Sequence, residues 1–172
     1  RRSRAKALAG AARRVLLVRI DDRIGEALLT TPLLAALSKA SPPPEVHVLV
    51  HPKALRVLEG HPLAARLVPF DRRRLWWGPL APGVRALRKE RYDAVVNCAN
   101  WEAPSVTQAI VSRLVSPRAA LVGPSVWPVG LLADLPVAPR PDTRNEVQQR
   151  LHLLGPLGVL PGPAPLSFRK PR

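Results

Sequence analysis

The stretch VLLVRIDDRIGEALLTTPLL, residues 15–34, decides the fold class of this 172-residue chain. Residues 15–19 form an apolar-rich run that ends in arginine, which is typical of a strand buried on both faces of a parallel sheet. A polar loop with one glycine, Gly25, follows, and residues 25–40 then carry apolar side chains at helical spacing. Pro32 interrupts this helical pattern, so the sequence predicts a helix that restarts there with Thr31 as its cap.

The remainder of the chain alternates between strand and helix signals. Further strands are predicted at residues 46–50, 66–70, 94–98 and 119–122. Further helices are predicted at residues 52–59, 84–90 and 104–115, and a last one opens at the capping-box pattern Thr143-Arg-Asn-Glu146. Residues 123–141 are rich in proline and show no clear element. This alternation predicts an α/β fold, a Rossmann-like parallel sheet with helices on both faces.

The composition divides the chain into three parts. Residues 1–14 form a basic lead-in, residues 15–159 carry the α/β pattern, and residues 160–172 read as a proline-rich tail or linker. Hydrophobic residues make up 47% of the chain, which is enough for a packed core. The single cysteine, Cys98, excludes an intrachain disulfide and is expected to be a small buried side chain. No apolar run approaches the roughly 20 residues of a spanning helix.

The net charge of +15 points to an anionic partner. A chain rich in Ala, Leu, Pro, Arg and Val is also what GC-rich coding produces, so only part of this excess charge indicates function. A nucleic-acid-binding module is one alternative. Against it, the arginines are scattered, aromatic residues make up 4% of the chain, and no recognition motif is present.

The loop after the first strand carries a cluster of charged side chains. It lacks the G-x-G-x-x-G fingerprint of dinucleotide-binding folds, so tight pyrophosphate binding is not expected there. Instead, Glu26 falls in the first helical turn, where the helix dipole favours an anion. A glutamate in a first turn is also common as a purely structural feature. Asp21 and Asp22 are a weak candidate for Mg²⁺, and the four histidines show no metal-ligand spacing.

Several motifs, in order, resemble those of the lipopolysaccharide heptosyltransferases, glycosyltransferase family 9. The opening stretch resembles that family's first strand, polar loop and helix. Further resemblances are EVHVLV at residues 45–50, RLVPFD at 66–71, ERYDAVV at 90–96 and NEVQQRLHLLGPLG at 145–158. Together they span roughly residues 14–159.

The resemblance implies the N-terminal, acceptor-side half of a GT-B architecture of two Rossmann-like domains. Such enzymes move a sugar from a nucleotide-diphosphate sugar to an anionic, lipid-linked acceptor with inversion. Glu26 takes the position of the family's catalytic aspartate, which accepts the proton of the attacking hydroxyl. The donor would bind mostly to a second domain absent from this chain, which would then be inactive alone. No cofactor or metal is implied, and the expected location is cytoplasmic, with a peripheral position on the inner membrane face as an option.

The residues expected to contact the acceptor come from three loops. They are Arg19, Asp22, Arg23, Thr30, Arg72, Arg73, Arg74, Asn100 and Trp101. The arginine run precedes Trp76 and Trp77, so contact with an anionic membrane surface or a merely solvated loop are its alternatives. Trp101 is a candidate for stacking on a sugar, whereas Asn100 is equally suited to capping its own loop. A non-catalytic scaffold of the same fold is the remaining alternative for the whole chain.

Overall fold

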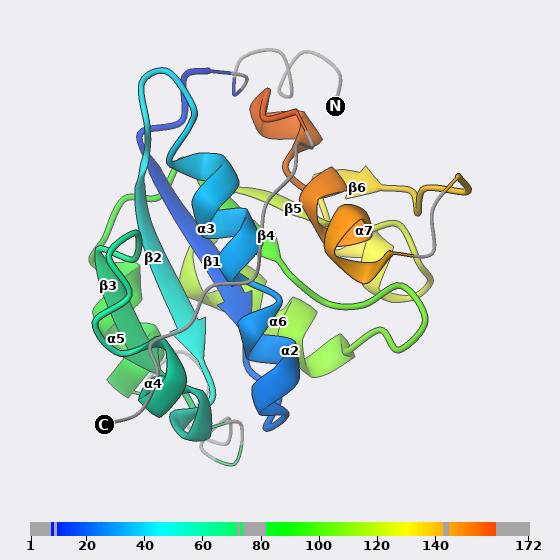
Figure 1. Cartoon of the computed structure of the whole chain (residues 1–172). Coiled ribbons are helices and arrows are strands. Elements are labelled where there is room, and N and C mark those ends of the chain that lie inside the picture. The colour runs from blue at the N-terminus through cyan, green and yellow to red at the C-terminus, as the bar shows by residue number, and fades with distance from the viewer. Residues whose placement is uncertain (1–7, 9, 72, 74–81, 143–144, 161–172) are drawn as a thin grey trace.

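The computed structural model describes residues 8, 10–71, 73, 82–142 and 145–160. They form a six-stranded parallel sheet in the order β3-β2-β1-β4-β5-β6 (Figure 1). The strands are β1 (Arg14–Arg19), β2 (Glu45–Val50), β3 (Arg66–Pro69), β4 (Ala94–Asn97), β5 (Ala120–Pro124) and β6 (Leu135–Val137). The helices are α2 (Ile24–Leu28), α3 (Thr31–Leu37), α4 (Pro52–Leu58), α5 (Pro82–Arg88), α6 (Val106–Val115) and α7 (Glu146–His152), with 3₁₀ turns η2 (Val129–Leu131) and η3 (Gly155–Leu157). The predicted α/β fold with a parallel sheet is confirmed.

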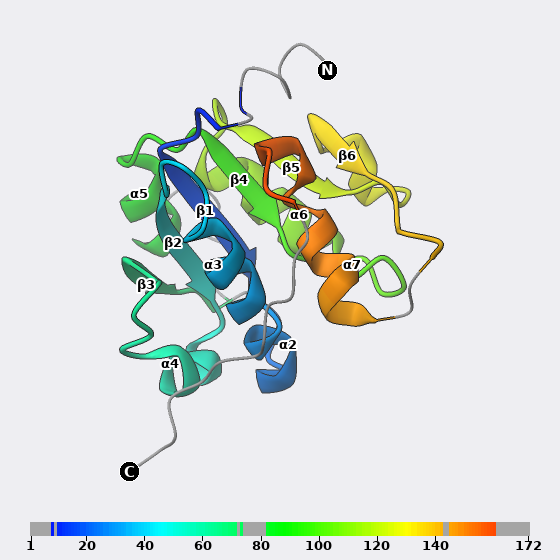
Figure 2. The ribbon, with the colours of Figure 1, turned by 45° about the horizontal axis from the view of Figure 1, so that its top comes forward.

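Helices cover both faces of the sheet, which explains the apolar strands. Along β1, Val15 and Leu17 pack into the core shared with α3, α4 and α7. Leu16 and Val18 point the other way, into the core shared with α5 and α6. Figure 2 shows α3 and α7 side by side on the near face, with α6 behind the sheet. A strand packed on both faces needs apolar residues at every position, as the opening stretch has.

Residues 123–141, for which no element was predicted, contain η2 and the edge strand β6. Among the described strands, β6 pairs only with β5, and Pro136 lies in the middle of β6. Proline lacks the backbone N–H that a central strand would need, but an edge strand tolerates it. Strand β6 was therefore not predicted, because proline is usually taken as evidence against a strand.

Two predicted helix caps differ from the structure. Helix α3 begins at Thr31, so Thr30, and not Thr31, is the residue before its first turn. Helix α7 begins at Glu146, where the Asn145 side chain accepts the Gln148 N–H at 3.2 Å. The predicted start at Thr143 is wrong, because asparagine caps the helix two residues later. Thr143 itself lies outside the described residues.

The strand order reverses between β1 and β4, since β1 pairs with β2 on one side and β4 on the other. In α/β proteins, ligands bind beside the carboxyl ends of the strands at such a reversal, so the loops that leave β1 and β4 are the place to look for a site. Among the described residues, no helix combines the length and apolar character needed to cross a membrane.

Candidate functional site

The two loops at the reversal point are tied to the sheet by one buried side chain, Gln108 of α6. Its amide nitrogen donates to the Val18 carbonyl at 2.9 Å and to Asn97 Oδ1 at 2.7 Å. Its amide oxygen accepts the Ile20 N–H at 3.1 Å. All polar atoms of this amide are therefore engaged, which fixes where both loops begin.

Glu26, in the first turn of α2, binds two arginines from distant parts of the chain. Arg19 is the last residue of β1, and Arg150 lies in α7. The Nη2 atoms of both arginines donate to the same carboxylate oxygen, Glu26 Oε2, in short charge-assisted hydrogen bonds. We call these three side chains the Glu26 clamp. The clamp joins the end of β1, the start of α2 and α7.

The two arginines also share a second acceptor, the backbone carbonyl of Cys98 just after β4. Arg19 Nη1 donates to it at 2.5 Å and Arg150 Nη1 at 3.0 Å. Each guanidinium therefore bridges the Glu26 carboxylate and the loop that follows β4. Such forked contacts fix orientation as well as distance.

Two further carboxylates balance the charge of the clamp. Asp21 Oδ2 lies 2.6 Å from Arg19 Nε, and Glu146 Oε1 lies 2.6 Å from Arg150 Nη2. Arg19 and Arg150 are only 5% and 1% exposed, so their charges need these partners. Burial lowers the pKa of Arg19 and the neighbouring charge of Arg150 lowers it further, whereas Asp21 and Glu26 raise it. The result is a dense cluster of compensated charge at the reversal point.

Glu26 keeps part of its side chain accessible to solvent. Its side chain is 18% exposed, compared with 6% and 1% for the side chains of its two arginine partners. Both arginine contacts use Oε2, so Oε1 takes no part in them. A carboxylate held on one oxygen, with the other outside the contact, has the geometry that a general base requires.

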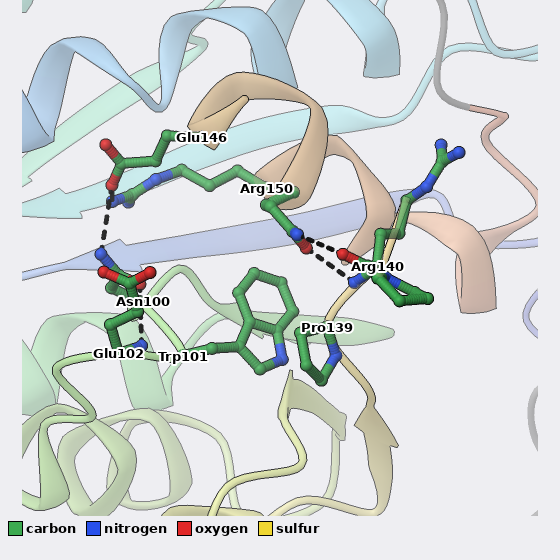
Figure 3. Close-up of a pocket in the computed structure, with 9 residues that line it drawn as sticks. Asn100, Trp101, Glu102, Pro139, Arg140, Glu146 and Arg150 are labelled. Carbon is green, nitrogen blue, oxygen red and sulfur yellow. Dashed lines mark hydrogen bonds and ion pairs between the residues drawn. The ribbon is translucent and has the colours of Figure 1, made fainter. Parts of the chain in front are cut away.

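A pocket of about 580 Å³ adjoins the clamp, and Arg150 belongs to both (Figure 3). We call it the Trp101 pocket. It is lined by Asn100, Trp101, Glu102, Pro139, Arg140, Pro141, Glu146, Gln149 and Arg150. Its volume lies within the roughly 300–1,000 Å³ typical of small-molecule sites. Glu26 is not among the lining residues and is linked to the pocket through its contact with Arg150.

Hydrogen bonds hold the walls of the Trp101 pocket in place. The Trp101 indole Nε1 donates to the Val137 carbonyl at 2.9 Å, and the residue is only 8% exposed. Asn100 Nδ2 donates to Glu146 Oε1 at 3.3 Å. Figure 3 places Asn100, Glu102 and Trp101 opposite Glu146 and Arg150. The pocket thus lies between the loop after β4 and α7.

The structure brings together four of the residues expected at the site. Arg19 and Glu26 meet in the clamp, and Asn100 and Trp101 line the adjoining pocket. Because Trp101 is largely buried and belongs to the core beneath the pocket, only a small part of its ring is available for contact.

The other expected contact residues are placed differently. Asp22 and Arg23 are exposed on the loop after β1, and Asp22 Oδ2 lies 4.0 Å from Lys53 Nζ. Thr30 is fully buried, and its hydroxyl donates to the Ala27 carbonyl at 2.6 Å, so it serves the helix junction and is left out of the contacts proposed below. Arg73 is exposed. Arg72 and Arg74 lie outside the described residues.

Sequence analysis missed Arg150 and Glu146. The sequence did contain a pattern that could have indicated Arg150. Arg150 directly precedes Leu151 and follows Val147 by one helical turn, which places a charged side chain beside the apolar face of α7. A fully buried arginine needs carboxylate partners, and Glu146 is one turn earlier. The sequence pattern could not predict that Arg150 also binds Glu26, which lies 124 positions away in the chain.

The structure also describes Cys98 and the acidic side chains that were candidates to bind a metal. Cys98 is completely buried, as expected, and burial raises the pKa of its thiol to about 11. Within the part of the chain that the structure describes, no group of three or more His, Cys, Asp or Glu side chains could hold a metal ion. Asp21, the weak candidate for Mg²⁺, is paired with Arg19.

No protein-family model matches the chain, and no curated protein matches it either. Solved structures do match it. The E. coli heptosyltransferase WaaC with ADP superposes with a TM-score of 0.69 at 22% identity, covering 87% of this chain and 48% of that one. The glycosyl transferase family 9 structure from Veillonella parvula DSM 2008 gives a TM-score of 0.65 at 21% identity, covering 86% of this chain and 42% of that one. The E. coli ADP-heptose lps heptosyltransferase II gives a TM-score of 0.61 at 19% identity, covering 89% of this chain and 45% of that one.

These structural neighbours are family 9 glycosyltransferases, as the sequence motifs indicated, and the chain spans about half of their length. At this level of identity the likeness establishes the fold. The chain therefore has a glycosyltransferase-like, Rossmann-like fold that corresponds to one half of a GT-B architecture.

Proposed function

We propose that this chain is the acceptor-side domain of a glycosyltransferase. The reaction would transfer a sugar, of the hexose or heptose type, from a nucleotide-diphosphate sugar to an anionic saccharide or lipid-linked acceptor, with inversion. The observation that carries this proposal is the Glu26 clamp: the carboxylate of a partly exposed side chain, fixed by two buried arginines, at the sheet edge where ligands bind. The fold of the neighbours, one of them solved with ADP, supports it.

In this proposal Glu26 is the general base. The acceptor hydroxyl oxygen attacks the anomeric carbon from the face opposite the diphosphate, and the bond from that carbon to the diphosphate oxygen breaks. The bonding electrons leave with the nucleotide diphosphate, and Glu26 accepts the hydroxyl proton. A single displacement of this kind inverts the anomeric configuration. General-base catalysis by a positioned carboxylate contributes about 10²–10⁴-fold to the rate.

Arg19 and Arg150 are positioning residues in this mechanism. They hold Glu26 Oε2 and the Cys98 carbonyl together, so the carboxylate cannot rotate away from the crevice. A misplacement of about 1 Å at a reacting group can lower a rate by about a hundredfold. The arginines would therefore act on the rate through Glu26 and not by touching the substrates.

The remaining parts of the proposal concern binding. Asn100 and Trp101 would contact the acceptor from the pocket, and Arg23, Asp22 and Arg73 from the exposed loops. The nucleotide would bind mainly to a second domain, and no cofactor takes part. We further propose a cytoplasmic reaction, with the arginine-rich loop after β3 close to an anionic acceptor or membrane surface.

The proposal is tested by a transfer assay on a protein that combines this chain with its donor-binding domain. Nucleotide-diphosphate hexoses and heptoses are incubated with phosphorylated saccharide acceptors, products are detected by mass spectrometry, and NMR of the product gives the anomeric configuration. The expected result is a glycosylated acceptor of inverted configuration. Retention of configuration, or no transfer with any donor, would overturn the proposal.

The rival classes are tested by binding. A nucleic-acid module would retain arbitrary DNA with an affinity that falls steeply as salt rises, because each phosphate contact releases counterions. The glycosyltransferase proposal expects weak binding to DNA that phosphorylated saccharides compete away. DNA binding unaffected by these saccharides would favour the rival class.

A further inference from the structure

We propose that the Trp101 pocket binds an uncharged sugar ring of the acceptor and excludes its phosphate groups. This inference rests on the proposed function above, because it assigns one part of the acceptor to one part of the crevice. Anionic groups of the acceptor would then have to bind outside this pocket.

The two cations of the pocket are already neutralised. Arg150 binds the carboxylates of Glu26 and Glu146, and its remaining terminal nitrogen donates to the Cys98 carbonyl. Arg140 forms a two-pronged ion pair with Asp142, in which Nε lies 2.8 Å from Oδ1. Figure 3 shows the Arg140 guanidinium pointing away from Trp101. Each of these arginines is paired with carboxylates, so neither brings an uncompensated positive charge to a phosphate in the pocket.

Negative charge prevails around the pocket. Glu102 lines it with an exposed side chain that forms no ion pair with any described residue, and Glu146 lines it from the opposite wall. Among the described residues, Glu26, Glu146, Asp142 and Asp21 pair with Arg19, Arg140 and Arg150, and Glu102 adds a fifth carboxylate to these three guanidinium groups. A bound phosphate would face Glu102 and Glu146, and placing like charges together is unfavourable.

The same groups suit a ring that carries hydroxyls. The carboxylates of Glu102 and Glu146 accept hydrogen bonds from hydroxyl groups, and Asn100 offers an amide that can donate or accept. The edge of Trp101 and the ring of Pro139 supply the apolar wall on which the C–H face of a sugar packs. The pocket therefore combines many acceptors with an apolar surface, as binding of an uncharged polyol requires.

The pocket is also formed in advance. Gln149 donates to the Arg140 carbonyl at 2.6 Å and accepts the Arg140 N–H at 2.8 Å, which fixes the wall opposite Trp101. Asn100 is held by its contact with Glu146 and by the Glu102 N–H, which donates to Asn100 Oδ1 at 3.0 Å. Walls fixed in this way lose little conformational freedom when a ligand enters.

The experiment uses the ¹⁵N-labelled chain and follows the Trp101 indole N–H and Asn100 amide signals by NMR. Methyl glycosides of neutral hexoses and heptoses are titrated against the corresponding sugar phosphates up to about 50 mM, a range that detects millimolar affinity. We expect the neutral sugars to shift both signals saturably and to bind at least tenfold more tightly than the phosphates. Replacing Glu102 by lysine, as E102K, should reverse this preference, because it places a cation in the pocket.

A matched control is E59K, which makes the same charge reversal at an exposed glutamate at the end of α4, on the β3 side of the sheet. It should leave the preference unchanged. Binding of phosphates as tight as that of neutral sugars, or the absence of saturable shifts with every neutral sugar, would overturn the inference. Either result leaves Glu26 catalysis to be judged by the transfer assay, so failure of the inference and failure of the proposed function are distinguishable.

Discussion

Replacing Glu26 by glutamine should destabilise the domain by removing one carboxylate from the Glu26 clamp. Glutamine keeps the shape of the side chain and one oxygen acceptor, so the change is mainly one of charge. It leaves Arg19 and Arg150, which are 5% and 1% exposed, without the negative charge that they share. The free energy of unfolding should fall, because a buried charge that has lost a partner destabilises the folded state.

The magnitude follows from what remains in the clamp. Breaking a buried ion pair by removing one partner costs about 3–5 kcal/mol. Here Arg19 keeps Asp21 at 2.6 Å, Arg150 keeps Glu146 at 2.6 Å, and both keep the Cys98 carbonyl. We therefore expect the lower end, about 3 kcal/mol, which corresponds to a decrease in Tm of about 6–12 °C for a domain of this size.

Urea unfolding of the isolated chain, followed by tryptophan fluorescence, measures this loss. The matched control is Glu59→Gln, an exposed glutamate at the end of α4, for which the change should stay within about 0.5 kcal/mol. A loss below about 1 kcal/mol for Glu26→Gln would mean that its contacts to Arg19 and Arg150 are not both formed in solution, and the reasoning would be refuted.

Three further changes test other parts of the structure. Gln108→Leu should destabilise the chain by about 2–4 kcal/mol in urea unfolding, because the buried N–H of Ile20 loses its acceptor. An unchanged urea midpoint would mean that the Gln108 side-chain amide does not anchor the two loops. Asn145→Ala should cost about 1 kcal/mol through loss of the α7 cap, measured in the same way, whereas Asn145→Asp should restore it. Stability should fall as the pH rises from 9.0 to about 11, because the folded chain holds the Cys98 thiol proton that the unfolded chain releases. The Cys98→Ala variant should show a flatter profile over this range, and an identical profile would contradict the raised pKa of Cys98.

Much of the fold could be predicted from the sequence, because the patterns that indicate each strand and helix are local. The apolar run at the start of β1 and the leucine spacing of α3 each lie within a few residues, and both elements were predicted. β6 was not predicted, because Pro136 is tolerated there only by virtue of the edge position, which is a property of the whole sheet.

Only part of the site could be predicted from the sequence, because some of its contacts join residues far apart in the chain. Glu26 and Arg19 are seven positions apart, so their contact is set by one strand, one loop and one helical turn. Arg150 reaches the same oxygen from α7, 124 positions away, and the Trp101 pocket forms between α7 and the loop after β4. Contacts of that kind depend on how α7 packs against the sheet, which the local pattern of α7 does not specify.

The transfer rate of the Glu26→Gln variant in a single-turnover experiment tests the role of this carboxylate most directly. The protein should combine this chain with its donor-binding domain, and Glu59→Gln should serve as the variant of equal charge change outside the crevice. We predict that Glu26→Gln transfers sugar about 10²–10⁴-fold more slowly while substrates still bind, because the hydroxyl proton loses its acceptor. A folded Glu26→Gln protein that transfers sugar as fast as the Glu59→Gln control would contradict the assignment of Glu26 as the general base.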